Sequence, residues 1–191
     1  MRLYMVPGAC SQAVHIGLRE TGLPFELEKV DLQAKKTADG GDYLAVNPKG
    51  QVPALKLDDE AVLTEVQVIL QYLADRAPAA GLLPAAGTMA RYRVLEWANF
   101  VSGEIHKAFG PLFRPTTPED FKPIVRDAVL AKLAIADKLL GESAHLAGDT
   151  LSIADIYLFV VARWTAWVGI DRSHLVNLQA FLDRLAARPR R

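Results

Sequence analysis

Hydrophobic and polar positions in the first 76 residues alternate between the period of strands and the period of helices. Val66, Ile69, Leu70 and Leu73 follow the spacing i, i+3, i+4, i+7, which predicts one apolar helical face. Shorter apolar runs bounded by polar residues, Pro or Gly predict strands. The pattern predicts strands at 2–5, 25–32, 54–57 and 61–63, a helix at 11–20 closed by Gly22, a loop at 35–41 and a turn at 47–50. The predicted order is therefore βαβ, a loop, then ββα.

From residue 88 onward the pattern is helical throughout. The stretch 77–87 is rich in Pro and Gly and resembles a linker. Four helical stretches follow, at 88–113, 119–140, 152–167 and 174–187, and Pro115 and Pro118 interrupt the pattern after the first. The sequence thus predicts an α/β domain at 1–77, a linker at 78–87 and an all-helical domain at 88–191.

One helix start has a clear capping signal. Ser152 and Asp155 are spaced as in a capping box, in which the hydroxyl and the carboxylate satisfy opposite backbone N–H groups. We interpret this pair as structural rather than catalytic.

Composition and charge exclude several classes of function. The chain has 191 residues, 22 Lys+Arg against 22 Asp+Glu, and 51% hydrophobic residues, so it predicts a folded domain without the basic field of a nucleic-acid binder. The basic residues at the end of the chain, Arg188, Arg190 and Arg191, are interpreted as a solvated tail. No run approaches the ~20 apolar residues of a membrane span, and no signal peptide is apparent, so we expect a cytoplasmic protein with no membrane partner. Four scattered histidines and a single cysteine predict neither an internal disulfide nor a metal site.

The single cysteine, Cys10, is the most informative residue. It follows a predicted strand and a Pro-Gly turn and precedes a predicted helix, so its sulfur is expected at the positive end of a helix dipole. That position predicts a pKa below the usual value of about 8.5. The position three residues on is Ala13, so the thiol can form a disulfide only with an external thiol. From topology alone, a reactive thiol and a small buried hydrophobe remain equal alternatives.

Two further segments of the first domain could bind a peptide-like ligand. Val52 precedes Pro53 at a predicted strand start, where a cis peptide would let the backbone of Val52 pair with an extended peptide. Glu65 and Val66 begin a helix, so exposed amides could bind a carboxylate while Glu65 accepts from an ammonium. The alternative for Glu65 is simple complementation of the helix dipole.

A polar stripe interrupts the long helix of the second domain. Asn99, Gly103 and His106 are spaced four and three residues apart and share one predicted face, and Glu104 and Lys107 flank His106. Gly103 would allow close approach of another group, which favours a pocket. Lys35, in the polar loop, could bind a phosphate or carboxylate or could simply be solvated.

Taken in order, these segments resemble the glutathione transferases, and specifically their bacterial beta class. The resemblance rests on Pro7–Ser11, Val46–Leu55, Leu63–Glu65, Glu104–Lys107, Pro111–Pro115 and Ile153–Tyr157, which extend over almost the whole chain. It implies a thioredoxin-like domain followed by a helical-bundle domain, a homodimer, and glutathione as co-substrate without a metal.

The resemblance also implies roles for individual residues. Cys10 would lie beside the glutathione sulfur, with Ser11 and His106 as catalytic neighbours. The implied glutathione-binding residues are Cys10, Lys35, Val52, Pro53, Glu65, Val66, Asn99, Gly103, Glu104 and His106, and Trp164 would line the pocket for a small hydrophobic electrophile. Val66 departs from the family, which has Ser or Gly there, so we expect a branched side chain at the pocket and weaker binding of glutathione.

The expected activity is conjugation of glutathione thiolate to hydrophobic electrophiles. One alternative is glutathione-dependent disulfide exchange or peroxide reduction through Cys10. Another is a non-catalytic ligand-binding or transcription-associated protein of the same fold. The presence of Cys10, Glu65 and His106 favours an enzyme.

Overall fold

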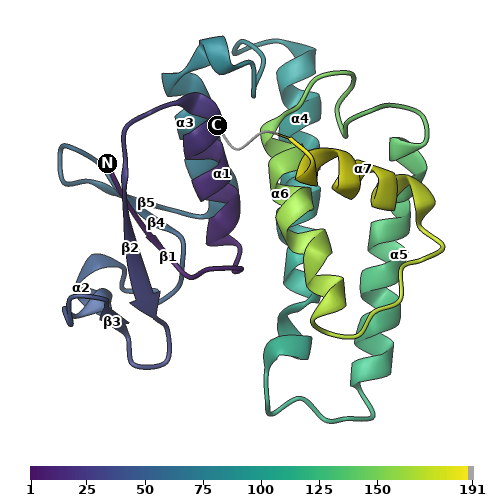
Figure 1. Ribbon diagram of the computed structural model, residues 1–191, viewed down its shortest axis with the longest axis horizontal. Coiled ribbons are helices and arrows are strands. Elements are labelled where there is room, and N and C mark those ends of the chain that lie inside the picture. The colour runs from purple at the N-terminus through teal and green to yellow at the C-terminus, as the bar shows by residue number, and fades with distance from the viewer. Residues whose placement is uncertain (189–191) are drawn as a thin grey trace. The chain divides into compact units, whose positions relative to one another are not determined.

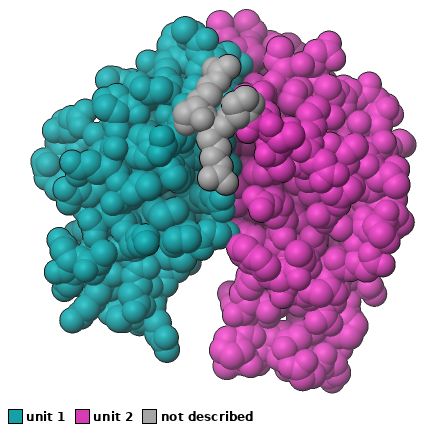
Figure 2. Space-filling view, viewed as in Figure 1, with its two compact units in different colours: residues 1–83, 191 teal, residues 84–190 magenta. Residues whose placement is uncertain are grey.

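The computed structural model describes residues 1–188, which form two compact units (Figure 2). The first unit is Met1–Leu83 and the second begins at Pro84. Arg190 and Arg191, which the sequence analysis interprets as part of a solvated tail, lie outside the described residues.

The first unit is built on a five-stranded mixed sheet of order β3-β2-β1-β4-β5 (Figure 1). β1 pairs parallel with β2, and the other neighbours pair antiparallel. The strands are β1 Arg2–Met5, β2 Glu26–Asp31, β3 Lys36–Thr37, β4 Ala54–Lys56 and β5 Val62–Thr64. The predicted βαβ unit and the later hairpin are therefore confirmed.

Helices α1 (Ser11–Thr21) and α3 (Val66–Arg76) pack against each other beside this sheet (Figure 1). The predicted apolar face of α3 is buried, and α1 approaches it closely at Gly17. A Cβ placed at Gly17 would lie 2.6 Å from Cδ2 of Leu70, so any larger residue would require the Leu70 side chain or the helix contact to shift. Gly22 ends α1 in the left-handed conformation with φ 67°, as the sequence predicts.

Two short elements between β2 and β4 differ from the sequence prediction. Residues 35–41 were expected to be a loop, but Lys36 and Thr37 form β3 against the end of β2. A four-residue helix, α2 (Tyr43–Val46), follows, and Asp42 caps it by accepting from the N–H of Leu44. Elements this short have no hydrophobic period, so the sequence pattern could not reveal them.

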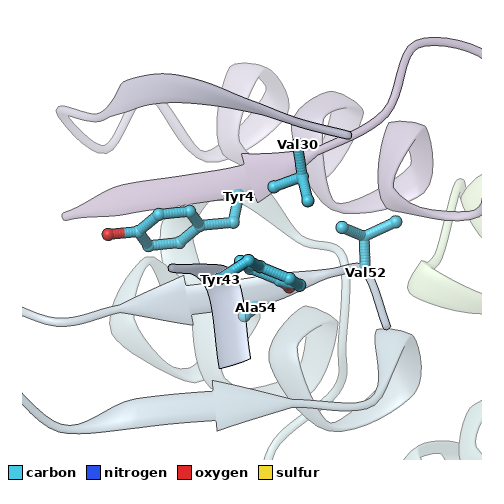
Figure 3. Close-up of a cluster of buried hydrophobic side chains, with 5 residues drawn as sticks. All are labelled: Tyr4, Val30, Tyr43, Val52 and Ala54. Atoms are coloured by element: carbon cyan, nitrogen blue, oxygen red, sulfur yellow. The ribbon is translucent and has the colours of Figure 1, made fainter. Parts of the chain in front are cut away.

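The tyrosine at the start of α2 is the centre of a small hydrophobic cluster on the sheet. Figure 3 shows this cluster, which comprises Tyr4, Val30, Tyr43, Val52 and Ala54. Tyr43 is fully buried, and its hydroxyl donates to the carbonyl oxygen of Gln51 at 2.6 Å. The cluster thereby fixes the segment that leads into Val52.

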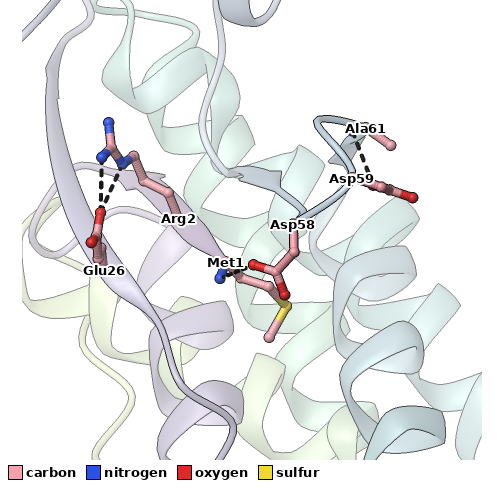
Figure 4. Close-up of polar contacts among 6 residues, drawn as sticks. All are labelled: Met1, Arg2, Glu26, Asp58, Asp59 and Ala61. Atoms are coloured by element: carbon pink, nitrogen blue, oxygen red, sulfur yellow. Dashed lines mark hydrogen bonds and ion pairs between the residues drawn. The ribbon is translucent and has the colours of Figure 1, made fainter.

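Polar contacts lie around the start of the central strand β1 (Figure 4). Arg2 pairs across the parallel strands with Glu26 at 2.8 Å, and the terminal ammonium of Met1 pairs with Asp58 at 2.8 Å. In the hairpin between β4 and β5, the N–H of Ala61 donates to Asp59. These exposed contacts fix register and contribute little stability individually.

The second unit is helical over its described length. Its elements are α4 Met89–Phe100, a π-helical turn η2 Val101–His106, the 3₁₀ turn η3 Gly110–Phe113, α5 Lys122–Leu140, α6 Ile153–Ala162, the 3₁₀ turn η4 Arg163–Ala166 and α7 Val176–Ala186. A further 3₁₀ turn, η1 (Pro78–Ala80), ends the first unit. α4 packs on α6, and α5 packs on α7.

Every residue of α6 is buried, as expected of a helix that is apolar on all sides. The predicted capping box at its start is confirmed. Asp155 is fully buried and accepts from the N–H and the hydroxyl of Ser152 at 2.8 and 2.6 Å, and from the N–H of Leu146 at 2.8 Å. One carboxylate therefore ties the helix start to the preceding loop.

The first long helix is less regular than the sequence predicts. The expected helix over 88–113 consists of α4, the π-turn η2 and the separate 3₁₀ turn η3. Gly103, which is unfavourable within an α-helix, lies in the π-turn. α5 begins at Lys122 rather than at residue 119, with Pro123 in its first turn, where the missing N–H has no cost.

None of the helices in residues 1–188 has the length and apolar character needed to cross a membrane.

Candidate functional site

Cys10 lies at the start of α1, immediately before its first helical residue. Its Sγ is 3.3 Å from the carbonyl oxygen of Val52 and donates to it. The peptide bond between Val52 and Pro53 is cis, which confirms the prediction made for that bond. The fold therefore brings the thiol and the backbone of Val52 together, although 42 positions separate them in the sequence.

The expected low pKa of Cys10 is wrong. Burial raises the pKa of this thiol to about 11, and the negative charge of Glu65 adds to the increase. The backbone N–H of Ser11 acts in the opposite direction, as the helix-dipole argument requires, but its effect is smaller. At neutral pH Cys10 is therefore a protonated thiol and a hydrogen-bond donor.

Ser11 is fully buried, and its hydroxyl is engaged with the backbone of Val6. It accepts from the N–H of Val6 and donates to the carbonyl oxygen of the same residue, both at 3.1 Å. These two bonds fix the loop that leads from β1 to Cys10. Any effect of Ser11 on the sulfur thus comes through its backbone N–H and this loop.

Glu65 occupies the position before α3 with a strained backbone. Its φ of 68° lies in the left-handed region, which is unusual for a residue other than glycine. The carboxylate is paired with Nζ of Lys49 at 2.7 Å, and the same ammonium donates to the Thr64 hydroxyl at 3.0 Å. Glu65 therefore pairs with an ammonium group of the chain itself, and its predicted contact with the ammonium of a ligand stays a prediction.

Lys49 is a partner of Glu65 that the sequence pattern did not reveal. It belongs to the turn at 47–50, which the structure confirms through the bond from the N–H of Gly50 to the carbonyl oxygen of Asn47. The sequence signal was that this lysine lies in the predicted turn just before Val52 and Pro53. Its pairing with Glu65, 16 positions away, depends on the tertiary fold.

Val66 has a buried side chain, and the expectation that it borders the glutathione pocket stays a prediction. The residue is 4% exposed, with the buried positions of α3. Val66 is the first residue of that helix. The N–H of Val66 thus belongs to the helix N-terminus, while its branched side chain contributes to packing.

Lys35 has a defined position beside the same turn. Its backbone has φ 55°, and its Nζ donates to the carbonyl oxygen of Gly50 at 2.8 Å. An ammonium carries three donors, so this bond leaves capacity for a second partner. The ammonium of Lys35 therefore lies against the turn that contains Lys49.

In the second unit His106 belongs to a cluster of aromatic rings. Its Nδ1 is 2.6 Å from the hydroxyl of Tyr157 on α6, and its ring meets that of Trp164 edge-on with centroids 4.9 Å apart. The aromatic cluster also includes Phe109 and Phe113, which both contact Trp164. Trp164 and Phe109 are buried. Sequence reasoning identified His106 and Trp164 but not the role of Tyr157.

The remaining predicted residues of the second unit lie at its surface. Asn99 and Gly103 are exposed, and a Cβ at Gly103 would meet nothing within 4 Å, so no close approach requires this glycine. Glu104 forms an ion pair with Lys132 of α5. Because the π-turn begins at Val101, the α-helical spacing used to place Asn99, Gly103 and His106 on one face does not hold.

The structure thus groups the predicted residues within each unit. Cys10 and Val52 are in contact in the first unit, and His106 and Trp164 are in contact in the second. The expectation that Cys10 and His106 face one tripeptide joins residues of different units and stays a prediction. In residues 1–188 no three His, Cys, Asp or Glu side chains are grouped so that they could hold a metal ion.

Comparisons with known proteins identify the family. Two family models match, the N-terminal domain of glutathione S-transferase over residues 8–76 and its C-terminal domain over residues 100–189. Glutathione S-transferase GstA of Escherichia coli O157:H7 is 48% identical over 189 residues, which are 99% of this chain and 94% of that protein. The chain therefore belongs to the glutathione S-transferase family.

Solved structures agree with this assignment. A sphingomonad glutathione S-transferase complexed with glutathione is 50% identical, with a TM-score of 0.96 over 99% of this chain and 94% of that one. A bacterial beta-class glutathione S-transferase of Sphingomonas chungbukensis is 49% identical, with the same TM-score and coverage. The resemblance seen in the sequence, to the bacterial beta class, is thus confirmed.

Proposed function

We propose that this chain is a glutathione transferase that joins the thiolate of glutathione to small hydrophobic electrophiles. Family membership supports the reaction class. The observation in the chain itself that carries the proposal is the contact between Cys10 Sγ and the carbonyl oxygen of Val52. It places a thiol donor beside the backbone segment to which the cysteinyl part of glutathione would pair.

The first unit offers groups that complement glutathione, a peptide with two carboxylates and one ammonium. Glu65 would accept from the ammonium, and the N–H of Val66 at the start of α3 would donate to the neighbouring carboxylate. Lys35 would bind the other carboxylate, and Val52 and Pro53 would present backbone to the middle residue. Lys49, which pairs with Glu65, supplies positive charge at the same end of the site.

The high pKa of Cys10 favours an assisting role over a nucleophilic one. With a pKa of about 11, about one molecule in ten thousand carries the Cys10 thiolate at pH 7. A protonated Cys10 can instead donate its S–H to the glutathione thiolate. In the reaction the glutathione thiol loses its proton to solvent or base, its sulfur forms a bond to the electrophilic carbon, and the leaving group departs with its electron pair.

The second unit would supply Asn99, Gly103, Glu104 and His106 to glutathione, and Trp164 to the electrophile. The aromatic cluster around Trp164 supports an apolar acceptor site. On this proposal residues 1–77 bind glutathione and residues 88–191 bind the electrophile. We further propose that the chain acts as a cytoplasmic homodimer, which size-exclusion chromatography with light scattering tests directly.

The test is retention on immobilised glutathione followed by turnover with a chromogenic dinitrophenyl halide. We expect retention, elution by free glutathione and glutathione-dependent turnover. Cys10→Ala is expected to keep most of the conjugation rate and to lose disulfide exchange. Equal loss of both activities in a folded Cys10→Ala protein would contradict the assisting role.

A non-catalytic binder is the second candidate, and Val66 is the residue that favours it. The family has Ser or Gly at this position, so Val66 removes a hydroxyl from the glutathione contact. Retention on glutathione without turnover over a broad panel of electrophiles would support this candidate. Restored turnover in Val66→Ser would show that the side chain limits the enzyme.

A further inference from the structure

Asn47 is a polar side chain that is buried within the turn at 47–50 of the first unit. It is 2% exposed, although most asparagines in turns are solvated. A buried amide is costly unless its polar atoms are hydrogen-bonded, so its partners indicate what the residue holds in place.

The two ends of the Asn47 amide have different partners. Its Oδ1 accepts from the N–H of Lys49 at 3.1 Å, a bond that stays within the turn. Its Nδ2 donates to the carbonyl oxygen of Gln51 at 2.7 Å, which lies just beyond the turn. The backbone carbonyl of Asn47 accepts from the N–H of Gly50 and closes the turn without help from the side chain. The amide therefore connects the turn to the residue that precedes Val52.

The carbonyl oxygen of Gln51 receives a second donor from the hydrophobic cluster on the sheet. The hydroxyl of Tyr43 donates to it at 2.6 Å. The Tyr43 ring is fully buried and belongs to the same cluster as Val52 (Figure 3). A carbonyl oxygen has two lone pairs, so Asn47 and Tyr43 together satisfy both of them.

Fixing the Gln51 carbonyl also fixes the direction of the Val52 N–H. The peptide between these residues is trans, and in a planar trans peptide the C=O and the N–H point to opposite sides. Within residues 1–188 the Val52 N–H has no hydrogen-bond acceptor, whereas the carbonyl oxygen of Val52 accepts from Cys10. Unpaired backbone donors at a nearly buried residue are rare, which points to an acceptor supplied by a ligand.

We propose that Asn47 and Tyr43 are positioning residues for glutathione binding. By holding the Gln51 carbonyl they aim the Val52 N–H at a carbonyl oxygen in the middle of the tripeptide. This inference rests on the proposed function, in which Val52 pairs with the cysteinyl residue. Neither side chain needs to touch the ligand, because each acts through one peptide plane.

The energetic role of the two side chains is preorganisation. When the peptide plane is fixed before binding, the ligand does not have to order it. That advantage applies equally to the bound substrate and to the transition state, so its loss raises KM for glutathione and leaves kcat almost unchanged.

The test is steady-state kinetics of the full chain with glutathione as the varied substrate. Tyr43→Phe and Asn47→Ala each leave one donor on the Gln51 carbonyl and are expected to raise KM about three- and fivefold, with kcat within about twofold. The double variant leaves no donor and is expected to raise KM by more than the product of the single effects. Tyr43→Phe removes one oxygen atom from a packed ring, so it keeps the test available if Asn47→Ala does not fold.

Tyr4→Phe is the matched control, because it makes the same chemical change in the same cluster. Figure 3 shows the Tyr4 hydroxyl pointing away from Val52, so this variant is expected to keep the parent KM.

Asn47→Ser separates the contact with Gln51 from the turn. Its hydroxyl can accept from the N–H of Lys49 but is too short to reach the Gln51 carbonyl. It is expected to raise KM as much as Asn47→Ala. A parent-like KM in Asn47→Ser would assign Asn47 to the turn alone and overturn the proposal.

Nuclear magnetic resonance measures the same contacts without turnover. Hydrogen bonding deshields a carbonyl carbon, so the ¹³C signal of the Gln51 carbonyl is expected to move upfield in Tyr43→Phe and in Asn47→Ala. The Val52 N–H signal of the parent is expected to shift when glutathione is added.

The outcomes distinguish this proposal from the proposed function. A parent that does not bind glutathione would overturn both. A parent that binds glutathione would overturn this proposal alone if its Val52 N–H signal did not respond. The same holds if KM and the Gln51 carbonyl signal stayed unchanged in both Asn47→Ala and Tyr43→Phe.

Discussion

The hydroxyl of Tyr157 lies 2.6 Å from Nδ1 of His106, and the two side chains come from different helical elements of one unit. Tyr157 is buried in α6. When the Tyr157 hydroxyl donates to Nδ1, the proton of a neutral imidazole lies on Nε2. Tyr157 therefore positions the His106 ring, without itself needing to touch a substrate.

Replacing Tyr157 by Phe is expected to lower kcat for conjugation about three- to tenfold, because a net buried hydrogen bond contributes about 1 kcal/mol. A double-mutant cycle distinguishes positioning from general loss of structure. In a His106→Ala background the Tyr157→Phe change is expected to have no further effect on kcat. Tyr92→Phe, an exposed change on α4, is the control and should leave kcat unchanged. An additive loss in the double mutant would contradict the positioning role.

The sequence predicted those features that depend on neighbouring residues. Gly22 at the end of α1 and the Ser152–Asp155 box are confirmed because caps are local chemistry. The pairs Lys49–Glu65 and His106–Tyr157 were missed because tertiary packing brings their members together across 16 and 51 positions. The residues near each position do not indicate which distant residue it will contact in the folded chain.

The error about Cys10 has the same origin. The helix dipole is visible in the sequence, and the backbone N–H of Ser11 does favour the thiolate. Burial, which raises the pKa, is a property of the folded environment and has the larger effect. The direction of the Cys10 pKa shift therefore depends on how the thiol is buried in the folded protein.

The raised pKa of Cys10 predicts a loss of stability at alkaline pH. An unfolded thiol with a pKa near 9 ionises before the folded thiol, whose pKa is about 11. Its contribution is fully present below pH 9 and declines as the pH rises toward 11, by up to about 2 kcal/mol. Urea unfolding at pH 8.5 and 10.5 measures it, with Cys10→Ser as the reference that lacks this titration. Parallel pH dependence in the two proteins would contradict the assignment.

Asp155 is expected to be the most sensitive residue at the start of α6. Asp155→Ala removes the acceptor for three donors and leaves them buried, so the free energy of unfolding should fall by about 3 kcal/mol. Ser152→Ala should cost about 1 kcal/mol. Asp149→Ala, at an exposed position of the preceding loop, is the control and should change stability by less than about 0.5 kcal/mol. Chemical denaturation measures all three, and similar values for Asp155→Ala and Asp149→Ala would refute the network.

Two glycines in helical segments are expected to respond in opposite ways to alanine. At Gly17 the new Cβ would lie 2.6 Å from Leu70, so the packed α1–α3 contact must shift at a cost of about 1–3 kcal/mol. At Gly103 the Cβ meets open space, and alanine should be neutral or stabilising by up to about 1 kcal/mol. Thermal unfolding of the two variants compares them directly. A lower Tm for Gly103→Ala would mean that this glycine has a packing role that its open surroundings do not show.

Glu65 and Glu60 form a matched pair for testing the glutathione site. Both have positive φ, 68° and 69°, both are exposed, and each pairs with a lysine, Lys49 for Glu65 and Lys56 for Glu60. Only Glu65 stands at the start of α3, where the ammonium of glutathione is proposed to bind. Glu65→Gln is therefore expected to raise KM for glutathione about tenfold with little change in kcat, because binding energy common to substrate and transition state is lost.

Glu60→Gln removes the same charge and the same type of ion pair from the neighbouring hairpin. It is expected to leave KM for glutathione unchanged. Comparison of the two variants therefore separates the specific role of Glu65 from a general effect of charge or of a strained glutamate. Steady-state kinetics at fixed electrophile concentration provides both values. An equal rise in KM for the two variants would assign the effect to the overall charge of the unit, and no rise in either would remove Glu65 from the binding site.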